Sequence, residues 1–303
     1  MTNSETLWEI PEPLAIHEVH MDDGNSIILR RHGNPAGPML VLCHGNGLAI
    51  DLYYPFWSLL TEEFDVIVHD LRNHGWNTVG SQERHNLPVF VEDYDRIVEA
   101  IDRHFGQKPK IGVFHSVSAL TSLLSPAHGR TFAARVLFDP PVCKADEFPE
   151  EFDVATRRCT EIARRRTDRF ESLEECADFL GYLPAFKRVV PGTLELYARS
   201  ILRKSANGQG YVLRCPRDYE AQVINYARGF AVMVDFDEYQ CPTKVIGADP
   251  VLPYSYLPTF DLSHILNVDY DFLPDSTHFL QLEQPAECVE AMREFLESHD
   301  LLH

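Results

Sequence analysis

The sequence predicts an α/β fold with a mostly parallel central sheet, helices on both faces of the sheet, and an inserted helical cap. Three observations lead to this prediction. Short apolar runs alternate with amphipathic stretches, a hairpin signal precedes them, and a long helical segment interrupts the alternation. Strand–helix alternation is typical of a parallel sheet covered on both faces. We expect residues 1–142 and 233–303 to form the core, and residues 143–232 to form the cap.

The N-terminal part predicts an antiparallel hairpin, because residues 16–21 and 26–31 bracket the turn sequence Asp-Asp-Gly-Asn. Short apolar runs then predict strands that are buried on both faces. These runs are Met39–Cys43, Asp65–His69, 110–114, Ala134–Phe138, 243–246 and 265–272. Apolar residues at helical spacing predict one helix over 90–105 and another over 289–296.

The alternation stops between about residues 143 and 230, where the pattern becomes helical and no strand-like run is longer than Tyr211–Leu213. Strands resume afterwards, so we interpret this segment as an insertion into the sheet domain rather than as a separate helical domain. Its aromatic residues suggest an apolar lining, although packed helices need such residues in any cap; they are Phe170, Phe179, Tyr182, Phe186 and Tyr197.

Composition excludes several classes of partner. The 303 residues carry a net charge of -19, and both nucleic acid and anionic membranes select basic surfaces, so we expect neither as a partner. The N-terminus shows no signal-peptide pattern, and no run reaches the roughly 18 apolar residues of a membrane span. The seven cysteines form no C-x-x-C pair, which favours free thiols in the cytoplasm over a zinc or redox motif.

The segment around Ser116 indicates a nucleophile. An apolar strand ends in a turn that holds this serine, and small and apolar helical residues follow, as in a nucleophile elbow. Here the chain resembles the α/β-hydrolase family, whose pattern G-x-S-x-G corresponds to Phe114-His115-Ser116-Val117-Ser118. Ser118 is a mild replacement for the second glycine, whereas the large Phe114 must find room beside a strained turn. We expect His115 to pack rather than to act as a base.

Two further segments carry the resemblance. His44-Gly45-Asn46-Gly47 follows a predicted strand and resembles the family's H-G-x-x oxyanion loop. By this resemblance, the backbone N–H groups of Asn46 and Val117 are the oxyanion donors. The run from Asp70 to Gly75, Asp-Leu-Arg-Asn-His-Gly, resembles the family's D-x-R-G-x-G. We expect this run to brace the elbow and to take no catalytic part.

The acid and the base should follow the serine in that order. Asp249 ends the run Gly247-Ala248-Asp249 after a predicted strand, and His278 lies in a loop that resembles the family's G-H-f-x-x-x-E-x-P. We therefore expect Asp249 to orient His278. Asp139 is the alternative acid, because it also ends a strand and some relatives place the acid on that neighbouring strand.

These residue types predict a serine hydrolase that cleaves a carboxylic ester of a small molecule through an acyl-serine intermediate. An imidazole takes the serine proton, and a carboxylate on its other nitrogen fixes the tautomer. The same groups also serve thioesterases, lactonases and C–C bond hydrolases, and a receptor that has lost turnover is the rival from another class. We expect no cofactor and no metal, since no histidine pair has metal-ligand spacing.

An arginine-rich stretch of the cap raises a question about substrate charge. Residues 151–170 carry six arginines against four acidic residues, within an acidic chain. This stretch is either a patch that steers anionic substrates towards the elbow or a solvated helix face whose arginines pair with nearby acids.

Overall fold

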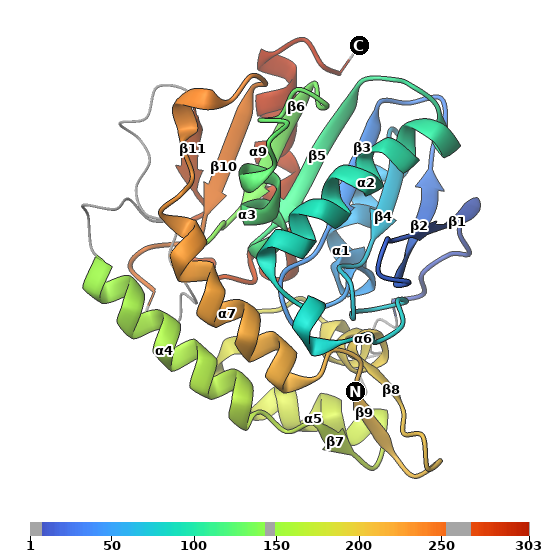
Figure 1. Ribbon diagram of the computed structural model, residues 1–303, viewed down its shortest axis with the longest axis vertical. Coiled ribbons are helices and arrows are strands. Elements are labelled where there is room, and N and C mark those ends of the chain that lie inside the picture. Colours follow the sequence, from blue (N-terminus) through green and yellow to red (C-terminus); the bar gives the residue numbers. More distant parts are fainter. Residues whose placement is uncertain (1–7, 143–148, 253–267, 303) are drawn as a thin grey trace, which may run out of the picture.

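The computed structural model describes residues 8–142, 149–252 and 268–302. Its main feature is an eight-stranded sheet in the order β1-β2-β4-β3-β5-β6-β10-β11 (Figure 1). β1 and β2 pair antiparallel, as do β2 and β4, and every other neighbouring pair is parallel. The prediction of a mostly parallel central sheet is therefore confirmed.

The predicted strands agree closely with the observed ones. The strands are β1 (Ala15–His20), β2 (Ser26–Gly33), β3 (Met39–Cys43), β4 (Asp65–His69), β5 (Lys110–His115), β6 (Ala134–Phe138), β10 (Thr243–Gly247) and β11 (Asp269–Phe272). Every residue of β3, β4, β5 and β6 is buried, as expected for strands covered on both faces. The last predicted strand, 265–272, is shorter than expected, and its residues 265–267 lie outside the described residues.

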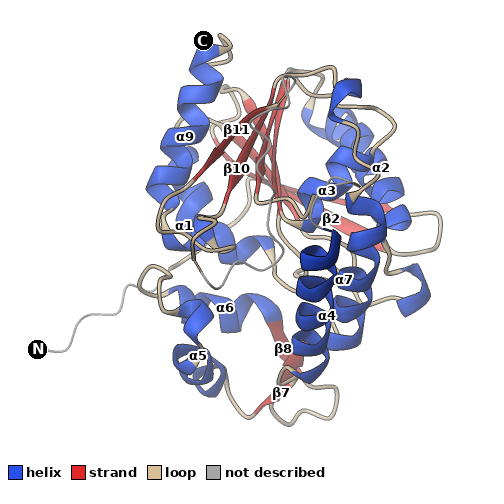
Figure 2. Ribbon diagram, turned by 90° about the vertical axis from the view of Figure 1, so that its left-hand side faces the viewer, coloured by secondary structure: helices blue, strands red, loops and turns tan. Residues whose placement is uncertain are grey.

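Helices cover the two faces of the sheet, which is sandwiched between them in Figure 2. α2 (Leu87–Phe105) and α3 (Val117–Leu124) lie on one face. α1 (Tyr54–Trp57), α8 (Leu280–Glu283) and α9 (Pro285–Ser298) lie on the other. Asn86 caps α2 by accepting a hydrogen bond from the Val89 N–H, and a proline near the start of α2 lacks the N–H that would otherwise be unpaired there.

The segment between β6 and β10 lies at the end of the sheet where the parallel strands finish (Figures 1 and 2). Its helices are α4 (Pro149–Arg165), α5 (Leu173–Tyr182), α6 (Thr193–Ile201) and α7 (Arg217–Ala231). It also holds a three-stranded antiparallel sheet of β7 (Arg169–Phe170), β9 (Tyr211–Leu213) and β8 (Leu202–Lys204). Strands of two or three residues are too short to show a period, so the sequence did not predict β7 or β8 and indicated β9 only as a short strand-like run.

The register of the sheet brings the loops after four strands to one edge. Cys43 of β3 pairs with Phe114 of β5, His115 pairs with Phe138 of β6, and Phe138 pairs with Ile246 of β10. The residues that follow these strands therefore lie side by side, beneath the segment between β6 and β10.

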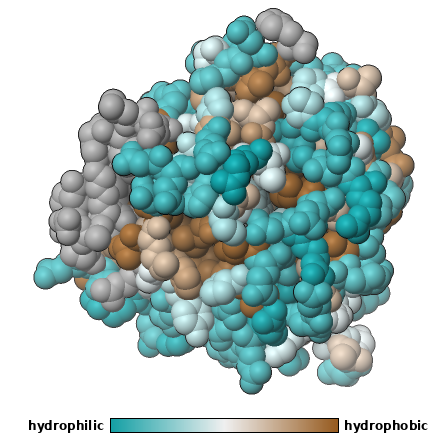
Figure 3. Space-filling view, turned by 45° about the horizontal axis from the view of Figure 1, so that its top comes forward, coloured by the Kyte–Doolittle hydropathy of each residue, from teal (hydrophilic) through white to brown (hydrophobic). Residues whose placement is uncertain are grey.

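The cysteines of the described residues are free thiols, as expected from the sequence. Six of the seven cysteines lie in these residues, and all six are buried and form no disulfide; Cys143 lies outside the described residues. Within the described ranges, no helix is both long enough and apolar enough to cross a membrane. The face drawn in Figure 3 is mostly hydrophilic, and hydrophobic residues gather in a band across its middle.

Candidate active site

Ser116 occupies a strained turn between β5 and α3. Its φ of 53° and ψ of -120° lie in a region that residues other than glycine rarely adopt. The turn lifts its side chain over the end of the sheet, where the residue is 9% exposed. The serine therefore sits in the geometry of a nucleophile elbow.

Phe114 finds its room on the core side of β5. Its ring packs edge-on against Tyr94 and Phe132, at centroid distances of 5.6 and 5.9 Å. Gly112, two residues earlier on the same face, makes this possible, because a Cβ there would lie 2.5 Å from the Phe114 ring. Gly112 thus provides the space that Phe114 needs in place of the first glycine of the elbow pattern, and the Phe114 ring packs against Tyr94 and Phe132.

His278 links the serine to a carboxylate. The Ser116 hydroxyl donates a hydrogen bond to Nε2 of His278 across 3.0 Å. On the other side of the ring, Nδ1 donates to Oδ2 of Asp139 across 2.5 Å. His278 and Asp139 are 5% and 1% exposed, so the three groups form a hydrogen-bonded chain largely shielded from water.

Among the described residues, the carboxylate on Nδ1 of His278 belongs to Asp139, the alternative acid, and no hydrogen bond or ion pair joins Asp249 to this histidine, so the expectation that Asp249 orients it is corrected. The Asp249 carboxylate instead accepts hydrogen bonds from the Val251 N–H at 3.0 Å and the Asp275 N–H at 2.8 Å. It closes the turn after β10 and holds the loop that leads to His278. In the sheet, β6 is the direct neighbour of β5, while β10 lies one strand further away. The Asp249 carboxylate is taken up by these two N–H groups, whereas the Asp139 carboxylate meets Nδ1 of His278.

The predicted oxyanion loop lies beside the serine. Gly45, Asn46 and Gly47 line the same cavity as Ser116 and Val117. The N–H groups on either side of Asn46 are already engaged: that of Gly45 donates to the Tyr53 hydroxyl at 3.2 Å, and that of Gly47 donates to Nε2 of His74 at 3.0 Å.

These two bonds fix the loop and leave the Asn46 N–H between them. Within the described part of the chain, the backbone N–H of Asn46 has no acceptor. The Val117 N–H lies in the first turn of α3, where the helix itself provides none. The two groups predicted as oxyanion donors are thus both available at the cavity.

The Asp70–Gly75 run was expected to brace the elbow, but its hydrogen bonds go to the oxyanion loop and the residues just after it. His74 donates from Nδ1 to the Arg72 carbonyl at 2.8 Å, which leaves its Nε2 lone pair for the Gly47 N–H. Asp70 accepts the Ile50 N–H at 2.8 Å, on the other side of the loop. None of the residues of this run lines the cavity.

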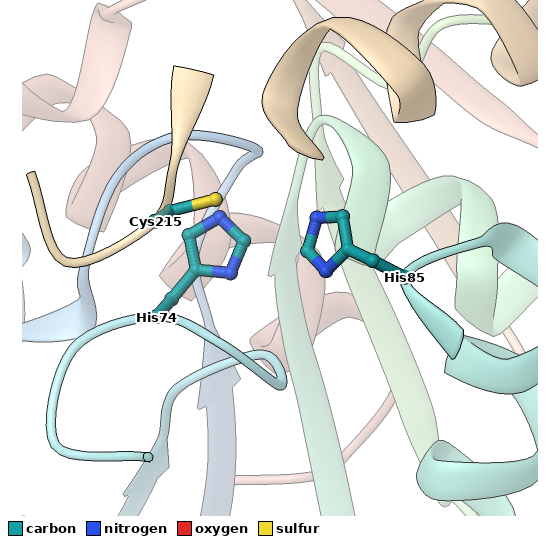
Figure 4. Close-up of side chains that lie close together, drawn as sticks. All are labelled: His74, His85 and Cys215. Atoms are coloured by element: carbon teal, nitrogen blue, oxygen red, sulfur yellow. The ribbon is translucent and has the colours of Figure 1, made fainter. Parts of the chain in front are cut away.

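His74, His85 and Cys215 form a buried cluster in which possible metal-ligand atoms lie within 4.8 Å of one another (Figure 4). Both histidines already use ring nitrogens in hydrogen bonds. Nε2 of His74 already accepts the Gly47 N–H. The Asn73 amide donates to Nδ1 of His85 at 2.8 Å, which places the His85 proton on Nε2.

The orientation of the Asn73 amide is itself fixed, because its oxygen accepts the Gly80 N–H at 2.6 Å. Burial lowers the pKa of both histidines, to about 3 for His85, so both rings are neutral at physiological pH. The hydrogen bonds of both histidines thus go to the core, to Gly47, Arg72 and Asn73, while the Cys215 thiol donates to the Pro216 carbonyl at 3.8 Å.

His115 has both ring nitrogens engaged. Nδ1 accepts a hydrogen bond from the Tyr53 hydroxyl at 2.6 Å, and Nε2 donates to the backbone carbonyl of His278 at 2.9 Å. Burial lowers the pKa of His115 well below its usual range. The structure agrees with the expected packing role and adds a link, through Tyr53, between the oxyanion loop and the His278 backbone.

A cavity of about 190 Å³ lies above Ser116 and His278. Its floor is the oxyanion loop and the elbow, and its walls come from α4, α5, α6, α7 and the loops between them. Of the aromatic residues suggested as a lining, Phe170, Phe179, Phe186 and Tyr197 line it, whereas Tyr182 does not and is 81% exposed. The segment between β6 and β10 thus encloses the space in which a substrate would meet the serine.

Solved structures of several hydrolases are similar to this chain in fold. E-2-(acetamidomethylene)succinate hydrolase superimposes with a TM-score of 0.76 at 16% identity, over 93% of this chain and 99% of that one. The thioesterase domain from the curacin biosynthetic pathway gives 0.68 at 18% identity, over 92% and 99%. A thermophilic esterase from Thermogutta terrifontis gives 0.63 at 19% identity, over 94% and 99%. At such identities the likeness concerns the fold alone.

Sequence comparison identifies the family itself. No curated protein matches the chain in sequence. The sequence model described as "Alpha/beta hydrolase family" matches residues 40–291, which include the oxyanion loop, the elbow, both candidate acids and His278. The protein therefore belongs to the alpha/beta hydrolase family.

Proposed function

We propose that this protein is a serine hydrolase that cleaves carboxylic esters of small molecules through an acyl-serine intermediate. The observation that carries the proposal is the hydrogen-bonded chain from Ser116 through His278 to Asp139, at the floor of a cavity that Asn46 and Val117 also line. A serine hydroxyl is a weak nucleophile until a neighbouring imidazole accepts its proton. Here the imidazole is in place at Nε2.

The proposed reaction has two halves. In the first, Ser116 Oγ attacks the ester carbonyl while its proton passes to His278 Nε2, and Asp139 stabilises the imidazolium through Nδ1. The N–H groups of Asn46 and Val117 stabilise the oxyanion, and loss of one such donor typically costs about 3 kcal/mol. Collapse of this intermediate breaks the ester C–O bond, and the alcohol leaves with the proton from His278.

In the second half, water attacks the acyl-serine, His278 takes a proton from that water, and the acid is released as Ser116 recovers its proton. No step needs a cofactor, since proton transfer and oxyanion stabilisation supply the chemistry. Thioesters, lactones and activated C–C bonds engage the same groups, so the class of scissile bond is the first thing to test.

The test is Ser116→Ala, assayed against a panel of acyl esters, thioesters and lactones. We expect wild type to hydrolyse esters and to be labelled by a fluorophosphonate, and the variant to lose both while unfolding at nearly the wild-type temperature, because a hydroxyl at this turn contributes little packing. Turnover above a few percent of wild type in the variant removes Ser116 from the mechanism. Labelling of wild type without turnover of any substrate supports the ligand-binding receptor instead.

A further inference from the structure

The wall of the cavity contains one ion pair. Arg166, which follows α4, donates from Nη1 to Oε2 of Glu220 in the first turn of α7, across 2.5 Å. The side chains are 20% and 6% exposed. Among the described residues that line the cavity, these two and His278 are the only ones of the Arg, Lys, Asp, Glu and His types. The pair leaves the cavity wall without net charge.

Glu220 is held firmly beside the oxyanion loop. Its carboxylate lies flat against Gly47, where a Cβ would stand 2.6 Å from Cδ of the glutamate. Its backbone carbonyl accepts a hydrogen bond from the Asn46 side-chain amide at 2.9 Å. Glu220 is therefore fixed with respect to the site of reaction.

Arg166 is held from a second side as well. Its Nη2 donates to the hydroxyl of Tyr197 at 3.2 Å, and Tyr197 is itself buried in α6. A guanidinium held in this way is a ready binding site for a carboxylate unless one already occupies it. In this protein Glu220 occupies it.

The remaining walls are mostly apolar. They are formed by side chains such as Phe170, Leu180, Phe186, Ile201 and Val223. The volume of about 190 Å³ is below the roughly 300–1,000 Å³ of sites for drug-sized ligands. A space of this size and lining suits a short or medium apolar chain.

The other arginines of the stretch do not face the cavity. Arg164 and Arg165 are exposed and both pair with Glu161, three and four residues earlier on α4, at 3.4 Å. This is the solvated helix face considered as one interpretation of the arginine-rich stretch. Arg166 is the one arginine of the stretch that lines the cavity. The other lining residues of the stretch are Ile162, Ala163, Thr167 and Phe170.

We propose that the cavity selects esters with a neutral, apolar acyl group, and that Glu220 is a specificity-determining residue that excludes carboxylate-bearing acyl groups by occupying Arg166. This inference rests on the proposed function and names its substrate class. A second carboxylate near Arg166 would meet the charge of Glu220 in a site of low dielectric, where repulsion is strong. Building an unfavourable charge against the wrong ligand is a general route to specificity.

The test compares two acyl groups of equal length, as the p-nitrophenyl ester of pentanoic acid and the mono-p-nitrophenyl ester of glutaric acid. Wild type should prefer the neutral ester in kcat/KM. In Glu220→Gln, which keeps the size of the side chain, the ratio should shift towards the glutarate ester by about tenfold or more, mainly through KM. Glu161→Gln, which releases the exposed Arg164 and Arg165, is the matched control and should leave the ratio unchanged.

Arg166→Gln provides an independent arm if Glu220→Gln does not fold. It leaves the carboxylate of Glu220 without its arginine, so the preference for the neutral ester should increase rather than fall. A Glu220→Gln ratio within twofold of wild type, or wild type that hydrolyses both esters equally, overturns the proposal.

A binding measurement separates this inference from the proposed function. The thermal shifts caused by neutral pentanamide and by glutaramate, the monoamide of glutaric acid, need no turnover. Glu220→Gln should gain stabilisation by glutaramate, and wild type should show none. If no ester is hydrolysed but these shifts appear, the proposed function fails while the inference about the cavity stands. If esters are hydrolysed and the shifts are absent, the inference alone fails.

Discussion

Two residues of the proposed active site have a positive φ, a backbone conformation that residues other than glycine rarely adopt. Ser116 has a φ of 53° and Asp139 has a φ of 40°. Such conformations cost about 1–3 kcal/mol each and persist where the surrounding structure imposes them. Both side chains converge on His278, one on each ring nitrogen. The backbone strain is therefore located at the two residues whose side chains hydrogen-bond to His278.

At this scale the two candidate acids can be separated by matched substitutions. Asp139→Asn should lower kcat by several orders of magnitude, about 10⁴-fold, because an amide no longer fixes the tautomer or stabilises the imidazolium. Asp249→Asn should reduce turnover far less and should mainly lower stability, by about 1–2 kcal/mol, because its carboxylate accepts two backbone N–H groups.

Steady-state ester hydrolysis and thermal unfolding of both variants decide between the acids. A larger loss of turnover in Asp249→Asn than in Asp139→Asn would return the role of acid to Asp249.

At the scale of the elements, the oxyanion loop depends on α7 and on the Asp70–Gly75 run. Gly47 has a φ of 73°, donates its N–H to His74 and touches Glu220 of α7. One loop residue thus connects β3, the run after β4 and a helix of the segment between β6 and β10.

Gly47→Ala should therefore disturb both the loop and the cavity wall. We expect a loss of about 1 kcal/mol or more in the free energy of unfolding, because alanine is strained at this φ, and a fall in kcat of about tenfold as the Asn46 N–H moves. Gly229→Ala is the control. Gly229 lies exposed in α7 with nothing near its added Cβ, so alanine should raise stability by about 1 kcal/mol and leave turnover alone. Equal behaviour of the two variants would contradict the account of Gly47.

At the scale of the whole molecule, the fold buries neutral histidines. Desolvation lowers the pKa of five of them: His32, His69, His74, His85 and His115. The pKa is about 4 for His32 and His69 and about 3 for His85, against 6.5 when unperturbed. Below pH 6.5 the unfolded chain therefore binds protons that the folded protein does not.

The sign of the effect follows from this difference in bound protons. These histidines leave stability unaffected well above pH 6.5 and reduce it as the pH falls from 6.5 towards 4. Each unit of pKa shift corresponds to about 1.4 kcal/mol, so His69 alone opposes folding by about 3 kcal/mol at the acidic end.

The free energy of unfolding in urea, measured between pH 7.5 and pH 4.5, should fall steadily. His85→Gln should flatten this dependence.

The sequence by itself determined the parallel sheet, the hairpin and the positions of the serine, the oxyanion loop and the histidine. These features are local: apolar runs, turn residues and a strand–turn–helix junction are each contained within a few consecutive residues. Their local signals survive in a single sequence because short-range sterics and burial on both faces of a strand dictate them.

Only the tertiary structure decided which carboxylate meets His278, because the way the loops after β6 and β10 pack against the His278 loop is a long-range property. The same holds for Phe114, whose fit depends on contacts with Tyr94 and Phe132. It also holds for the ion pair that neutralises the cavity, whose partners come from the end of α4 and from α7. Distances across a sheet or between helices are set by how separate elements pack, and no local pattern encodes them.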